Sequence, residues 1–262
     1  TLAAALISGE APALIHGLPL GEPLELWNNG QIIDLAPYMD DEWRAAFYPS
    51  SLDYLTIDGH ILSTSNATNN VQVFYNKDRF EELGIEAPLE TMEDVRAAVE
   101  TLKGAGYGGA LYWAQAYDHA PTLFFHWGQQ MYPDLFEAAD RGDGAWNIPE
   151  FVDLMADINS YSDIWMEGVA SLSLDESVNL FATGEASIYF IGNWAVNSIV
   201  KAEPAFEIDT FPIPALNEQT WPAAMGSMAG TWMVSSQVPQ EEQEAAVAFL
   251  RWVALNGQGD LV

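Results

Sequence analysis

The stretch Phe181-Ala-Thr-Gly-Glu-Ala-Ser-Ile-Tyr-Phe-Ile-Gly-Asn-Trp194 decides the fold, because it joins a helix end directly to a buried strand. Upstream, Ser173 and Glu176 have the spacing of a capping box that begins the helix. Gly184 ends the helix, since glycine readily takes the left-handed conformation just past a helix terminus. The apolar run 186–191 then reads as a strand covered on both faces. This order of helix, turn and strand predicts an α/β fold.

An indole follows this strand. Trp194 comes directly after the turn Gly192-Asn193. In open α/β sheets ligands bind beyond the carboxyl ends of the strands, so this position favours contact with a small molecule. A tryptophan packed into the core is the alternative interpretation of the same pattern.

The charge of the chain limits its partners. Among 262 residues there are 38 Asp and Glu against 8 Lys and Arg, and the net charge is -30. A protein that binds nucleic acid needs clustered basic residues to displace counterions, so nucleic acid is excluded as a partner. The acidic residues are spread along the chain, which favours a solvated surface suited to a saline environment over a field that attracts cations.

Helix and strand patterns alternate along the whole chain, which predicts α/β units with largely parallel sheets. Strands are expected near 71–75, 109–114 and 230–234, and an acidic surface loop is expected over 137–147. Pro212 and Pro214 cannot donate to a central strand ladder, so the segment before them is expected to leave its sheet as an extended linker.

Signatures of catalysis and of bound metals do not appear in the sequence. There is no cysteine, no glycine-rich phosphate loop, no Gly-x-Ser-x-Gly turn and no His-Glu-x-x-His pair. His119 and His126 could share a helix face, but two histidines alone make a weak metal pair. We therefore predict no enzyme, no cofactor and no metal site. A glycoside hydrolase, which needs two converging carboxylates, is the alternative from another class of protein.

Aromatic and amide side chains gather near the ends of the expected strands. They are Asn69, Asn70, Tyr112, Trp113, Tyr117, His119, Asn193, Trp194 and Trp232, with Gly226 and Gly230 close to the last of them. Flat apolar faces beside uncharged hydrogen-bonding groups suit a sugar, which has apolar C–H faces and many hydroxyls. A polyamine would instead need several carboxylates, and these candidate residues are mostly neutral.

An ordered set of short motifs resembles one protein family. The motifs are Asp58-Gly59-His60, Val73-Phe-Tyr-Asn-Lys-Asp-Arg-Phe80 with Leu83-Gly84-Ile85, the helix start Thr91-Met-Glu-Asp94, Phe181-x-x-Gly-Glu-Ala186 through Gly192-x-Trp194, Phe211-Pro-Ile-Pro214 and Glu244-Ala-Ala-x-x-Phe-Leu250. Each motif is weak alone, but their order across about residues 1–258 is specific. The chain resembles the extracellular solute-binding proteins of ABC importers, in their maltose-binding-like, carbohydrate-associated group.

The resemblance implies a two-lobed periplasmic-binding-protein fold, type II-like, with lobes joined by a hinge of several segments. It assigns 1–68 and 213–256 to the N-lobe, 73–207 to the C-lobe, and 69–72, 208–212 and 257–262 to hinge crossings and the return to the C-lobe. Family members have further elements before and after these motifs. The resemblance therefore implies that the chain is a fragment that lacks N- and C-terminal parts.

The resemblance also implies roles for individual residues. Trp194, beside Asn193, aligns with a position that commonly stacks on the sugar ring, and Asn69 aligns with a polar contact at the first crossing. The cleft is further expected to include His16, Trp113, Tyr117, Asp118, His119, Gly226 and Trp232. Pro12-Ala13 departs from the usual Pro-Asp of the family, so no contact is carried over to that position.

The implied function is a receptor that captures a neutral carbohydrate, from mono- to oligosaccharide, in a cleft between the lobes. Closure of the lobes would then present the solute to the membrane permease. The resemblance also implies a monomer located in the periplasm or outside the cell, where a lipid anchor would hold it.

Overall fold

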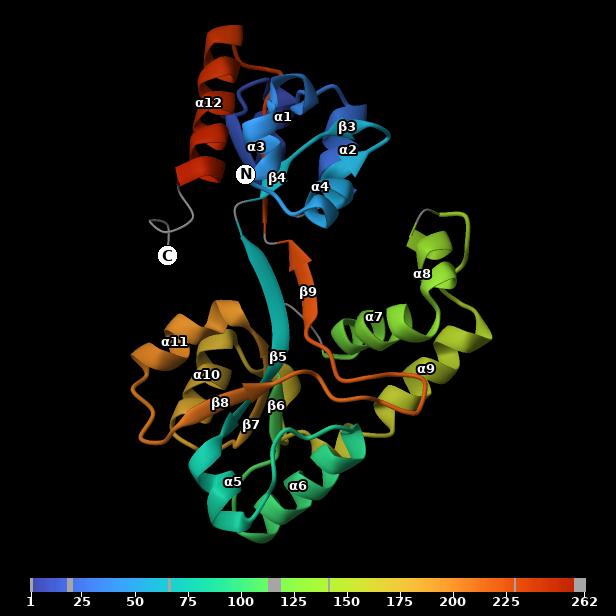
Figure 1. Cartoon of the computed structure of the whole chain (residues 1–262), viewed down its shortest axis with the longest axis vertical. Helices are drawn as coiled ribbons and strands as arrows, with labels where there is room; N and C mark the ends of the chain where they lie inside the picture. Colours follow the sequence, from blue (N-terminus) through green and yellow to red (C-terminus); the bar gives the residue numbers. More distant parts are fainter. Residues whose placement is uncertain are drawn as a thin grey trace. The chain divides into compact units, whose positions relative to one another are not determined.

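The structure, a computed structural model, describes residues 2–17, 21–65, 67–112, 119–140, 142–228 and 230–256. The chain divides into two compact units, unit 1 with Thr1–Asn69 and Ser227–Val262, and unit 2 with Asn70–Gly226 (Figure 1). The chain leaves unit 1 within strand β5 (Thr68–Asn76) and returns to it within β9 (Met225–Met228). Among the described helices, none is long and apolar enough to cross a membrane.

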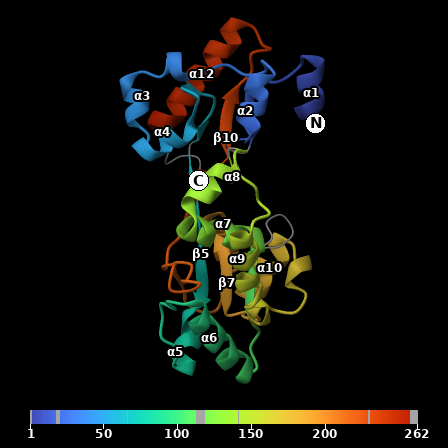
Figure 2. The ribbon, with the colours of Figure 1, turned by 90° about the vertical axis from the view of Figure 1, so that its right-hand side faces the viewer.

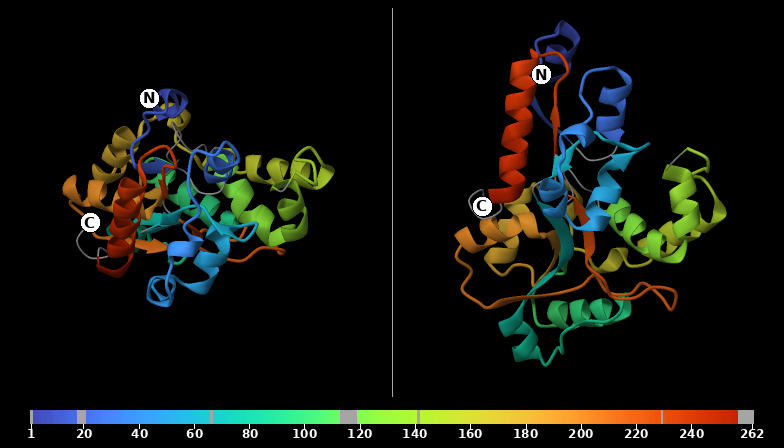
Figure 3. Two further views of the ribbon diagram at one scale, coloured as in Figure 1. Left: turned by 90° about the horizontal axis from the view of Figure 1, so that it is seen from above. Right: turned by 45° about the horizontal axis from the view of Figure 1, so that its top comes forward.

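Unit 1 is built around a three-stranded antiparallel sheet in the order β1 (Leu14–Gly17), β10 (Thr231–Val234) and β4 (Thr64–Ser65). Successive side chains alternate between the two faces of the sheet. Ile15 and Met233 therefore face one apolar cluster, with residues from α1 and α2, while Val234 faces another, with residues from α3 and α12. Figure 3 shows α12 running along this unit.

The remaining elements of unit 1 surround this sheet. Their bounds are α1 (Leu2–Ser8), α2 (Gly21–Asn28), η1 (Ala36–Tyr38), α3 (Asp41–Ala45), α4 (Pro49–Leu55), β2 (Thr56–Ile57), β3 (His60–Ile61) and α12 (Gln240–Asn256). Gly9, just past α1, has a positive φ of 73°, the left-handed conformation that commonly ends a helix.

Unit 2 has a sheet in the order β6 (Ala110–Tyr112), β7 (Ile188–Gly192), β5 and β8 (Ile208–Phe211), and β9 also pairs with β5. Its helices are α5 (Lys77–Leu83), α6 (Met92–Gly104), α7 (His119–Met131), α8 (Pro133–Asp140), α9 (Pro149–Asn159), η2 (Ser162–Ile164), η3 (Val169–Ser171), α10 (Leu174–Ala182), η4 (Asn193–Ala195) and α11 (Val196–Lys201). Helices α7 and α9 pack side by side (Figure 2). All residues of β7 are buried, which confirms a strand covered on both faces.

The helix boundaries of unit 2 confirm the predictions made from capping residues. Ser173 with Glu176, and Thr91 with Asp94, form complete capping boxes at the starts of α10 and α6. Gly184 follows α10 with a φ of 77°, the left-handed conformation that glycine takes most readily.

The prediction of largely parallel sheets was wrong. In the sheet of unit 2, β6 and β7 run parallel, whereas β5 is antiparallel to both β7 and β8. A strand buried on both faces shows the same continuous apolar run in either direction, so its composition does not reveal its orientation. The expected loop over 137–147 also differs, because α8 continues through residue 140.

The segment after β8 stays with unit 2, whereas the sequence analysis assigned residues 213–226 to the N-lobe. Ile213 forms an antiparallel bridge with Ala223, and Ala215 forms a parallel bridge with Thr91 at the start of α6. The indole N–H of Trp127 donates to the carbonyl of Pro214 at 3.0 Å. Prolines 212 and 214 thus interrupt the strand ladder without turning the chain away from this unit.

His126 on α7 makes the stability of unit 2 depend on pH. Burial lowers the pKa of His126 to about 4, and the Gln130 amide nitrogen lies 3.2 Å from its Nε2, as suits a neutral ring. The unfolded chain takes up this proton near pH 6.5, so the free energy of unfolding should fall by up to about 3 kcal/mol as the pH drops from 7 to 4.

Denaturant titrations of the protein and of His126→Gln between pH 4 and 8 measure this effect. Acidic groups titrate in both proteins, so the difference between the two pH profiles isolates His126. We expect the variant to lose less stability on acidification. Identical pH profiles of the two proteins would mean that His126 does not make the stability depend on pH.

Candidate functional site

The predicted binding residues that the structure describes fall into two groups, one in each unit. In unit 2, Trp194 lies in η4 immediately after β7, as the strand pattern predicts. Strand β7 is held between β5 and β6, and its last residue, Gly192, pairs with Val71 of β5. The sheet therefore fixes the backbone from which the indole projects.

The indole of Trp194 lies against its own strand. A Cβ atom placed on Gly192 would come within 2.0 to 2.3 Å of three carbon atoms of the Trp194 ring. Trp194 is nevertheless 37% exposed, so part of it is open to solvent. An aromatic face held in this way can stack on the apolar face of a ligand.

Asn193 connects the indole turn to the strand that enters unit 2. Its side-chain oxygen accepts a hydrogen bond from the backbone N–H of Asn70 at 3.2 Å. Within the described part of the chain, the side-chain oxygen of Asn70 itself is buried without a hydrogen-bond partner. Asn69, the predicted polar contact, precedes it in β5 and is half-buried.

Buried polar contacts join β7 and the turn before it to the neighbouring helices α10 and α5. The hydroxyl of Tyr189 lies 2.7 Å from that of Ser177 on α10, and burial raises the pKa of Tyr189 to about 12, so it stays neutral. Arg79 donates to the Gly184 carbonyl and, at 3.0 Å, to the Ser187 hydroxyl. These contacts join α10, the turn and the strand into one rigid support for Trp194.

In unit 1, His16 and Trp232 lie side by side on the sheet. They are paired across β1 and β10, and their rings meet edge to face with centroids 4.8 Å apart. His16 is exposed, while Trp232 is half-buried and also packs against the cluster of Leu35 and Trp43. Trp232 thus has a structural role whether or not it contacts a ligand.

The two predicted glycines, Gly226 and Gly230, differ in their surroundings. A Cβ atom on Gly230 would come within 2.4 Å of Nε2 of His16, so the imidazole lies on this glycine. Gly226, in β9, has open space around the same position, because no heavy atom lies within 4 Å of it. A larger residue would fit at Gly226.

Four predicted residues lie partly or wholly outside the described structure. Trp113, Tyr117 and Asp118 fall in the segment 113–118, which is not among the described residues. His119 is the first residue of α7, and only its backbone is described.

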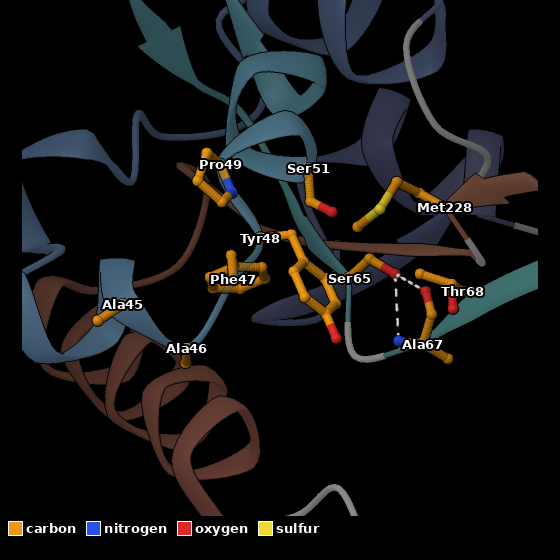
Figure 4. A pocket seen from close by; sticks show the side chains of 10 residues that line it. All are labelled: Ala45, Ala46, Phe47, Tyr48, Pro49, Ser51, Ser65, Ala67, Thr68 and Met228. Atoms are coloured by element: carbon orange, nitrogen blue, oxygen red, sulfur yellow. Dashed lines mark hydrogen bonds between the residues drawn. The ribbon is translucent and has the colours of Figure 1, made fainter.

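A cleft in unit 1 was missed by the sequence analysis. It has a volume of about 320 Å³, and Tyr48, Ser65 and Met228 lie around it (Figure 4). Its lining residues are Ala45, Ala46, Phe47, Tyr48, Pro49, Ser51, Ser65, Ala67, Thr68 and Met228, all uncharged. The one signal in the sequence is the aromatic pair Phe47-Tyr48 before Pro49, where Tyr48 is 78% exposed.

The described residues offer no group of three His, Asp or Glu side chains that could hold a metal ion. His60 instead pairs with Asp34 at 2.8 Å. Burial tends to raise the pKa of Asp34, but hydrogen bonds from His60, Ala36 and Ile61 outweigh it and hold the pKa below its usual range. This contact is a structural hydrogen bond between His60 and Asp34.

Comparisons with known proteins agree with this architecture. Residues 1–260 match the family "bacterial extracellular solute-binding protein". The "Multiple sugar-binding protein" of Streptococcus mutans is 21% identical over 225 residues, which cover 80% of this chain and 51% of the relative. The chain therefore spans about half the length of this curated relative.

Solved structures are similar over nearly the whole chain. A protein from a study of xylan utilisation by Caldanaerobius polysaccharolyticus has a TM-score of 0.79 and 21% identity, covering 97% of this chain and 66% of its own. The cyclic α-maltosyl-1,6-maltose binding protein of Arthrobacter globiformis has a TM-score of 0.68 and 27% identity, covering 98% and 64%. The chain therefore belongs to the bacterial extracellular solute-binding proteins and has their two-lobed periplasmic-binding-protein fold.

Proposed function

We propose that this protein is the solute receptor of an ABC importer and that it binds a neutral carbohydrate, from mono- to oligosaccharide. The observation that carries the proposal is the indole of Trp194, which is exposed at the end of β7 and supported from below by Gly192. A flat, preorganised aromatic face suits the apolar face of a sugar ring. The sugar ligands named for the related proteins support the same class of solute.

We call the predicted binding residues of unit 1 and those of unit 2 the two half-sites. The polar groups of both half-sites can form hydrogen bonds with the hydroxyls of a sugar. Asn193 precedes Trp194 and is hydrogen-bonded to the backbone of Asn70, and His16 is exposed on the sheet of unit 1. Amide and imidazole side chains offer hydrogen-bonding groups that suit sugar hydroxyls. The predicted contacts Asn69, Trp113, Tyr117, Asp118, His119, Gly226 and Trp232 complete the proposed site.

The proposed mechanism is closure of the two units on the solute. A ligand shifts a conformational equilibrium only by contacts that it makes more strongly in one state. A sugar held by both half-sites stabilises the closed form, because neither half alone supplies all the contacts. The membrane permease then recognises the closed, loaded form of a monomeric receptor. This receptor is extracellular or periplasmic, is held by a lipid anchor, and catalyses no reaction.

A cationic solute such as a polyamine is the second candidate, because the net charge of -30 would attract it. Binding would however need carboxylates in the site. The described members of the two half-sites are uncharged amides and aromatic rings, with one histidine. They favour the sugar.

A thermal-shift screen tests the proposal. Mono- and oligosaccharides are added to the protein, with spermidine as the cationic comparison. A sugar at 100 times its Kd should stabilise the folded state by about 2.7 kcal/mol. For a chain of this size that corresponds to a rise in Tm of roughly 5–10 °C. A response to spermidine and to none of the sugars would contradict the proposal.

A further inference from the structure

We infer that Gly192 is a positioning residue for ligand binding, because it is the seat on which the Trp194 indole rests. This inference rests on the proposed function and deepens it. It assigns a role to a residue that does not itself contact the ligand in the proposed site.

The geometry leaves no space for a side chain at this position. A Cβ atom on Gly192 would lie 2.0 Å from Cζ3, 2.2 Å from Cη2 and 2.3 Å from Cε3 of Trp194. Non-bonded carbon atoms normally approach to about 3.5–4.0 Å. Even an alanine would therefore push the six-membered edge of the indole away by more than about 1 Å.

The backbone gives no separate reason for glycine at this position. Gly192 has φ of -87° and ψ of 163°, an ordinary extended conformation that any residue adopts. Gly184, eight positions earlier, is different, because its φ of 77° favours glycine whatever surrounds it. The contact with the indole therefore explains why residue 192 is a glycine, whereas the backbone conformation does not.

The contact with Gly192 limits the conformational freedom of the Trp194 ring before a ligand binds. The pairing of Gly192 with Val71 fixes the end of β7, and the hydrogen bond from Asn70 to Asn193 fixes the next residue. Resting on the glycine, the indole has one supported part and one part open to solvent. A side chain ordered in advance loses less conformational entropy on binding. Displacing the ring would therefore weaken binding, although the side chain of residue 194 is still a tryptophan.

A double-mutant cycle tests whether Gly192 acts through Trp194. Calorimetry with a sugar found by the screen compares the protein with Gly192→Ala, Trp194→Ala and the double variant. We expect Gly192→Ala to weaken binding about tenfold or more, and to add less than about twofold in the Trp194→Ala background. Wild-type affinity in Gly192→Ala, or a full additional loss in the double variant, would overturn the inference.

A second readout does not depend on any sugar. Fluorine NMR of protein labelled with 5-fluorotryptophan reports the surroundings of each indole, and Trp194→Phe identifies the resonance of Trp194. Gly192→Ala should move that resonance. Gly104→Ala is the matched control, because Gly104 ends α6 and has no heavy atom within 4 Å of the added Cβ. If the Trp194 resonance does not move in Gly192→Ala, the inference that the indole rests on Gly192 is wrong. If the resonance moves but the protein binds no sugar, only the proposed function is rejected.

Discussion

Trp127→Ala should lower the free energy of unfolding by about 3–5 kcal/mol, the cost of emptying a buried site of tryptophan size. Trp127 is fully buried on α7, in the core that also includes Leu111 and Phe211 of the sheet. Its indole N–H donates to the carbonyl of Pro214 at 3.0 Å. The substitution therefore removes apolar contacts and leaves a buried carbonyl without its donor. Domains of this kind have about 5–15 kcal/mol of stability in total, so the loss is a large share.

Two matched variants separate these effects in urea titrations followed by circular dichroism. Trp127→Phe retains most of the ring but not the N–H, so it should cost about 1–3 kcal/mol for the unpaired carbonyl. Trp221→Ala removes a tryptophan that is mostly exposed, and it should change the stability far less. A loss for Trp127→Ala no greater than that for Trp221→Ala would show that this side chain does not hold α7 to the segment after β8.

Local signals predicted the helices of this protein well. The capping boxes at Ser173 and Thr91 involve residues three positions apart, so the sequence contains the whole interaction. The same holds for Gly184, whose conformation depends on the helix that it ends. Elements of this kind can be predicted because their stabilising contacts lie within a few residues.

The direction of the strands could not be predicted in the same way. Strand β5 pairs with β7 and β8, more than a hundred residues further along the chain. Nothing in the apolar run of a buried strand specifies whether its neighbour runs parallel or antiparallel to it. The tertiary pairing decided the topology, and the alternation of helices and strands was an insufficient guide to it.

The candidate site shows the same division between local and tertiary information. The position of Trp194 after β7 follows from the strand pattern, and its contact with Gly192, two residues earlier, is also local. The cleft at Tyr48 joins residues between 45 and 51 to Ser65, Ala67, Thr68 and Met228, which lie far apart from them in sequence. A single sequence contains no direct signal that residues so far apart will line one cleft.

Trp194→Ala should weaken binding of the carbohydrate by about 1.5–3 kcal/mol, which is about a 10- to 150-fold rise in Kd. The variant removes the aromatic face offered at the end of β7. Because Trp194 is 37% exposed in the absence of ligand, its loss should affect folding far less than the loss of a core tryptophan. Binding and stability should therefore separate in this variant.

Isothermal titration calorimetry on three variants makes this separation measurable. Trp194→Phe keeps a smaller aromatic face and should fall between the protein and Trp194→Ala. Trp252→Ala removes a more accessible tryptophan, 50% exposed on α12 of unit 1, and should leave the affinity unchanged. Equal affinities for the protein and Trp194→Ala would reject the stacking role, whereas equal losses at Trp194 and Trp252 would indicate a general effect of removing surface tryptophans. A loss confined to position 194, with the phenylalanine variant between, is what a stacking platform at the end of β7 requires.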